Sequence, residues 1–60
     1  MGIVGKKVLV LGLSRSGIAA ANFAKKHGAN VYLTESRDVT EDKLSQIKEL
    51  QSIGIHTEYG

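Results

Sequence analysis

The chain has 60 residues, of which 42% are hydrophobic and 23% charged, with a net charge of +2 and no cysteine. This length allows at most one domain, and without cysteine there is no disulfide, zinc–cysteine site or thiol nucleophile. The longest mainly apolar run, residues 8–13, is too short to cross a bilayer, and the N-terminus lacks a secretory signal pattern. The basic residues are scattered and not interleaved with aromatic ones. We therefore expect a cytoplasmic globular chain that binds neither membranes nor nucleic acids.

The first half of the chain reads as a strand, a glycine turn and a helix. All of residues 7–11 except the first are apolar. Such an uninterrupted apolar run is typical of a strand in a sheet covered on both faces. Residues 12–17 contain two glycines and two serines and predict a turn. Residues 18–27 are rich in alanine, which favours a helix, and Gly28 is expected to end it.

The second half repeats this alternation. Residues 30–34 are rich in β-forming side chains and predict a second strand. Thr40 is a good N-cap for a helix over residues 41–53, whose apolar side chains recur at helical spacing. Gly54 is expected to end that helix, and residues 55–59 alternate as a third strand. The order predicts an α/β fold: a truncated βαβαβ half of a Rossmann-like parallel sheet.

The glycine turn has the composition of a phosphate-binding loop. Gly12 ends the first strand and Gly17 lies at the start of the helix, so backbone N–H groups and a helix N-terminus meet there. Ser14 and Ser16 add hydroxyl groups, and Arg15 adds a positive charge. The alternative is a tight turn that needs its glycines for geometry alone.

The same turn partly fits the dinucleotide fingerprint G-x-G-x-x-G. Ser14 stands where that fingerprint has its middle glycine, which lets the backbone approach a pyrophosphate. Glu35 follows at the end of the second strand, where the fingerprint has an acid for ribose hydroxyls. Arg37 could flank the same ligand, and Ser36 between them offers a hydroxyl group. The alternative is that Glu35 and Arg37 are simply exposed to solvent. The residues alone leave open an NAD(P)-binding Rossmann domain of an oxidoreductase or a regulatory sensor.

Two segments resemble a known family. Residues 6–21, which contain the sequence GLSRSGIAAA, resemble the opening of the Mur ligases, and specifically those that add D-glutamate to UDP-N-acetylmuramoyl-L-alanine in peptidoglycan synthesis. Residues 33–37, with the sequence LTESR, provide the second match. A residue such as Ser14 at the variable small position of the turn is normal for that family, whereas Glu35 replaces the more frequent aspartate.

The resemblance implies that residues 1–60 are the N-terminal part of a Rossmann-like domain that binds the UDP-containing substrate. It places the diphosphate at Arg15, Ser16 and Gly17, with Gly12 and Ser14 shaping the turn. It places the uracil and its ribose at Glu35, Ser36 and Arg37.

Members of this family convert ATP to ADP and phosphate, and they couple this reaction to the formation of an amide bond to D-glutamate. By resemblance, the ATP site, the magnesium ligands and the D-glutamate site lie in later domains that are absent from this chain. The chain is therefore expected to hold no cofactor, no metal ion and no catalytic residue, and to be inactive alone. His27 and His56 are expected to be isolated and to have no catalytic role.

Overall fold

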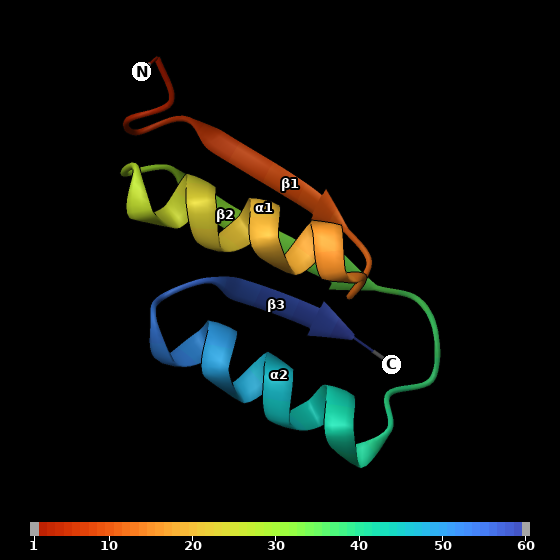
Figure 1. Cartoon of the computed structure of the whole chain (residues 1–60). Coiled ribbons are helices and arrows are strands. Elements are labelled where there is room, and N and C mark those ends of the chain that lie inside the picture. Colours follow the sequence, from red (N-terminus) through yellow and green to blue (C-terminus); the bar gives the residue numbers. More distant parts are fainter. Residues whose placement is uncertain (1, 60) are drawn as a thin grey trace.

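The computed structural model describes residues 2–59 and contains the five predicted elements in the predicted order (Figure 1). They are β1 (Lys7–Leu11), α1 (Arg15–Lys26), β2 (Asn30–Glu35), α2 (Glu41–Ser52) and β3 (His56–Tyr59). The three strands are parallel and form one open sheet in the order β1-β2-β3, so β2 is central. The fold is thus the predicted Rossmann-like βαβαβ unit. Within residues 2–59 no helix is long and apolar enough to span a membrane.

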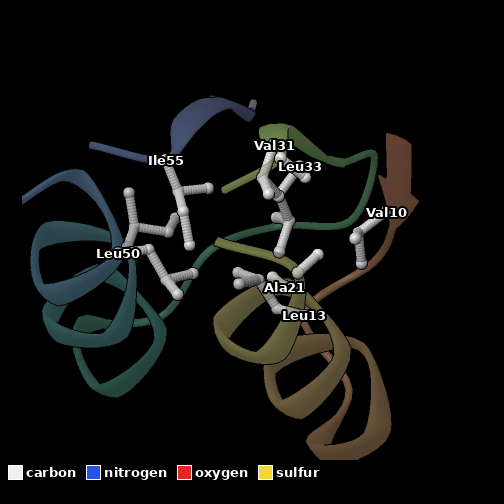
Figure 2. Close-up of a cluster of buried hydrophobic side chains, with 10 residues drawn as sticks. Val10, Leu13, Ala21, Val31, Leu33, Leu50 and Ile55 are labelled. Atoms are coloured by element: carbon white, nitrogen blue, oxygen red, sulfur yellow. The ribbon is translucent and has the colours of Figure 1, made fainter. Parts of the chain in front are cut away.

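Both helices lie on the same side of the sheet, and the core fills the space between the two layers (Figure 2). The alternation of β2 directs Val31 and Leu33 into this core, where Leu33 is only 1% exposed. Ile47 of α2 is also 1% exposed. The buried hydrophobic residues are Val10, Leu13, Ala21, Ala24, Ala29, Val31, Leu33, Ile47, Leu50 and Ile55. The small alanines of α1 let that helix pack close to the sheet.

The first helix begins three residues earlier than the sequence suggested. Ser14, and not a residue near Ile18, is its N-cap, because the Ser14 Oγ accepts a hydrogen bond from the Gly17 N–H at 3.0 Å. Residues expected to belong to the turn therefore form the first turn of α1. The C-terminal end agrees with expectation, since Gly28 follows the cap with a φ of +89°, a value that glycine adopts easily.

The second helix follows its sequence signals closely. The Thr40 Oγ1 accepts a hydrogen bond from the Lys43 N–H at 3.4 Å, which confirms Thr40 as the N-cap. Gly54 has a φ of +89° just beyond the helix. The helix ends at Ser52, and Ile53 is 48% exposed at the C-cap, so the last residue of the apolar repeat does not enter the core.

Within the described residues, the far face of the sheet is uncovered. The continuous apolar pattern of β1 is typical of a sheet covered on both faces, but the helices of residues 2–59 cover only one. Leu9 and Leu11 point to the other face, where they are 58% and 76% exposed. Also on this face, the Lys7 Nζ lies 4.8 Å from the ring centroid of Tyr32, a cation–π arrangement.

The two histidines are not isolated, contrary to expectation. The His56 Nε2 lies 3.5 Å from the Glu58 Oε1, and its ring centroid is 5.3 Å from that of Tyr32. The His27 ring lies 4.3 Å from the Phe23 ring, one turn earlier on α1. These neighbours account for both side chains as surface contacts of the fold.

Candidate functional site

A cavity of about 590 Å³ opens at the carboxyl end of the sheet. Its walls come from the ends of β1 and β2, the loops that follow them, and the first turn of α2. The lining residues are Leu11, Gly12, Leu13, Ser14, Thr34, Glu35, Ser36, Arg37 and Lys43. Ligands of open parallel α/β sheets bind outside the carboxyl ends of the strands. The cavity therefore lies where this architecture places a binding site.

The carboxylate of Glu35 connects the two loops that border the cavity. Its Oε1 accepts a hydrogen bond from the Leu13 N–H at 2.9 Å, and its Oε2 accepts one from the Arg37 N–H at 3.1 Å. The side chain is only 8% exposed although it carries a charge. A buried carboxylate needs such donors to replace lost hydration. Glu35 thus holds the loop after β1 and the loop after β2 in a fixed relation.

These contacts favour the ionised form of Glu35. The Leu13 N–H and then the Arg37 N–H hold the pKa of the Glu35 carboxyl below its ordinary value, and the nearby charges of Lys43 and Arg37 act in the same direction. Desolvation by burial opposes them by raising the pKa, but it is outweighed. The carboxylate therefore stays charged throughout the neutral range.

Acid is expected to destabilise the fold through Glu35. A carboxyl group whose pKa is lower in the folded chain adds stability that is complete above its unfolded pKa, about 4.3, and is lost as the pH falls through the folded pKa. Glu35→Gln should lower the melting temperature at neutral pH, because the amide nitrogen that replaces one carboxylate oxygen is a donor and cannot accept from an N–H group. It should also weaken the loss of stability that the parent chain shows as the pH falls. Thermal melts followed by circular dichroism from about pH 7 to about pH 2.5 measure both effects. Glu49→Gln, at an exposed acid of α2, is the control, and a pH dependence of stability in Glu35→Gln that matches the parent chain below about pH 4.3 would contradict the assignment.

The turn after β1 is shaped by two glycines with different roles. Gly12 has a φ of +97°, which side chains with a Cβ rarely adopt, and its N–H donates to the Thr34 carbonyl at 2.7 Å. Gly17 lies in α1, and a Cβ there would be 2.9 Å from the Gly12 carbonyl oxygen. Gly17 therefore permits the close approach of α1 to the end of β1. Ser14 caps the helix between them, with its Oγ 3.4 Å from that of Ser16.

The structure brings together most, but not all, of the predicted site residues. Those that line the cavity are Gly12, Ser14, Glu35, Ser36 and Arg37. Arg15, Ser16 and Gly17 belong to the first turn of α1 beside the cavity and are not part of its lining.

Within the described part of the chain, the N–H groups of Arg15 and Ser16 donate no hydrogen bond. This is normal for the first turn of a helix, whose N–H groups have no acceptor within the helix itself.

Sequence reasoning missed one charged residue of the cavity. Lys43 does not belong to the apolar repeat of α2, but it is half-buried and lines the cavity. A signal was available: the spacing Thr40-x-x-Lys43 puts lysine at the third helical position, where a capping box has Glu or Gln.

The described residues offer no set of metal ligands. Within residues 2–59, no three His, Asp or Glu side chains gather closely enough to hold a metal ion. The donors at the cavity are one carboxylate already bonded to two N–H groups, together with hydroxyl and cationic groups. Mg²⁺ prefers carboxylate and phosphate oxygens, and both oxygens of the one carboxylate that lines the cavity already accept from N–H groups.

Comparison with known proteins gives one consistent relationship. Over 54 residues, which is 90% of the chain, it is 43% identical to a UDP-N-acetylmuramoylalanine–D-glutamate ligase of Staphylococcus aureus strain MW2. Ligases of the same name from strains JH9 and Newman show the same identity over the same length. The matched segment spans only 12% of each of these relatives. No family model and no solved structure matches the chain.

The two segments that carried the resemblance, the turn around Ser14 and the loop around Ser36, are the two that border the cavity. The resemblance noted in the sequence and the sequence match thus agree. The chain is related in sequence, over a segment that spans 12% of their length, to the UDP-N-acetylmuramoylalanine–D-glutamate ligases.

Proposed function

We propose that the cavity at the carboxyl end of the sheet binds the uridine diphosphate part of UDP-N-acetylmuramoyl-L-alanine. The observation that carries the proposal is the cavity itself, formed where the turn after β1 and the loop after β2 meet. The names of the related ligases supply the substrate class. In this proposal the chain is the N-terminal, substrate-binding segment of a cytoplasmic ligase. The ligase converts ATP to ADP and adds D-glutamate to a peptidoglycan precursor.

Each loop has its own role in the proposed complex. The diphosphate lies against the first turn of α1, where the N–H groups of Arg15 and Ser16 and the positive end of the helix dipole favour an anion. Ser36 and Arg37 hold the uracil and its ribose from the other side of the cavity. Glu35 keeps these two loops at the spacing that the ligand requires, through its bonds to Leu13 and Arg37.

The chain contributes binding and not chemistry. ATP, Mg²⁺ and D-glutamate bind in the remainder of the ligase in this proposal, and residues 1–60 alone catalyse no reaction. The substrate is therefore anchored by its nucleotide at one end, which leaves its carboxylate to be presented to the rest of the enzyme.

The NAD(P)-binding alternative has less support. A Rossmann acid at the end of the second strand accepts hydrogen bonds from the ribose hydroxyls, whereas both oxygens of Glu35 already accept from backbone N–H groups and the side chain is 8% exposed. The Cβ of Ser14 stands where the dinucleotide fingerprint needs glycine. Neither observation favours a dinucleotide.

Calorimetric titration with UDP tests the proposal. Arg37→Ala is expected to raise the Kd for UDP about tenfold, because a hydrogen bond to a charged group contributes about 1.5–3 kcal/mol. Lys26→Ala removes the same charge from an exposed position at the other end of α1 and should leave the Kd unchanged. Equal UDP affinity in Arg37→Ala and the parent chain, or tighter binding of NAD than of UDP, would contradict the proposal.

A further inference from the structure

We propose that the ammonium group of Lys43 binds a phosphate group of the ligand in the cavity at the carboxyl end of the sheet. This cavity is called the carboxyl-edge cavity below. The inference rests on the proposed function and adds to it a second cationic contact, on the α2 side of the site. Lys43 comes from the first turn of α2 and lines the cavity together with Glu35 and Arg37. It is half-buried, whereas its neighbours Glu41 and Asp42 are exposed.

The position of Lys43 in its helix is unfavourable for a lysine. The first turn of a helix carries the positive end of the dipole, where acids are preferred, and Glu41 and Asp42 follow that preference. Lys43 does not, and it also occupies the position where Glu or Gln would complete a capping box with Thr40. Natural sequences break such local rules mainly at functional sites. The departure here falls on the one residue of that turn that lines the cavity.

The charge balance of the cavity wall favours an anion. Lys43 and Arg37 are cations, and within residues 2–59 neither forms an ion pair; the one described pair joins His56 to Glu58. The carboxylate of Glu35 is engaged by the N–H groups of two loops. Two cations therefore face a cavity with a single, already bonded carboxylate. A phosphate group matches this arrangement, because it accepts several hydrogen bonds and carries the opposite charge.

The test compares two lysines of the same helix in the full chain. Lys43→Gln and Lys48→Gln remove the same charge, but Lys48 is exposed and does not line the cavity. Lys43→Gln is expected to raise the Kd for UDP about tenfold, the usual effect of a charged hydrogen bond, and to leave the Kd for uridine unchanged. Lys48→Gln should change neither, and Lys43→Arg should restore part of the UDP affinity. Thermal melts check that every variant is folded.

The outcomes separate this inference from the proposed function. If Lys43→Gln binds UDP as well as Lys48→Gln does, or loses uridine as strongly as UDP, the role of Lys43 is overturned while the site stands. If the parent chain does not bind UDP, the proposed function is overturned and titration with inorganic pyrophosphate decides the inference. If the parent chain binds pyrophosphate and Lys43→Gln does not, the inference about Lys43 is supported. If the parent chain does not bind pyrophosphate, the inference is overturned as well.

Discussion

Replacing Leu33 by alanine is expected to unfold the chain or bring it close to unfolding. Leu33 lies on the central strand, between Val10 of β1 and Thr57 of β3 in the register, and is 1% exposed. Removing a buried leucine side chain destabilises proteins by about 2–5 kcal/mol. A domain of this size has a total stability of about 3–9 kcal/mol on the usual per-residue scale.

Urea denaturation followed by circular dichroism measures this loss. Leu11→Ala is a matched control, because it deletes the same atoms from a neighbouring strand at a position that is 76% exposed. Its effect should stay within about 0.5 kcal/mol, as for other surface substitutions. Equal losses in the two variants would show that the core is not on the helix side of the sheet.

Gly17→Ala is expected to destabilise the chain, although alanine is the better helix former. A Cβ at this position would lie 2.9 Å from the carbonyl oxygen of Gly12 and 3.3 Å from the Cγ1 of Val10. The first of these atoms is backbone and cannot turn away, so α1 or the turn must shift. Overpacking of this kind costs about 1–3 kcal/mol, more than the roughly 1 kcal/mol that helix propensity returns.

The measurement for Gly17→Ala is again the free energy of unfolding in urea. Asn22→Ala, at an exposed position in the same helix, should be neutral or slightly stabilising because only propensity changes. A shift of the turn would also move Ser14 and the wall of the cavity, so Gly17→Ala should bind UDP more weakly. A Gly17→Ala chain that is more stable than its parent would refute the close approach of α1 to Gly12.

The sequence was sufficient for the order and type of the elements because its local signals agree. Thr40 and Gly54 mark the two ends of α2 by cap chemistry that depends only on neighbouring residues. The start of α1 was placed too late because Ser14 has two possible roles, as part of a phosphate-binding turn or as an N-cap. The structure shows that it caps the helix.

The site was only partly predictable, for a different reason. That Glu35 would stand at the carboxyl edge follows from its place at the end of a strand. Its bond to the Leu13 N–H, 22 residues away, depends on how two loops meet in space, which no local pattern encodes. The place of Lys43 likewise depends on how α2 is rotated against the sheet, and helical spacing alone does not fix that rotation.

The most direct test of the central claim is an amide NMR titration of the isotope-labelled chain, first with UDP and then with NAD. If UDP binds in the carboxyl-edge cavity, it should change the amide chemical shifts of Ser14, Arg15 and Ser16 and of Ser36 and Arg37. The amide chemical shifts at the opposite end of the sheet should not change. NAD should leave the chemical shifts of the same amides unchanged. Shifts at these amides with NAD but not with UDP, or UDP shifts confined to residues far from the cavity, would contradict the account.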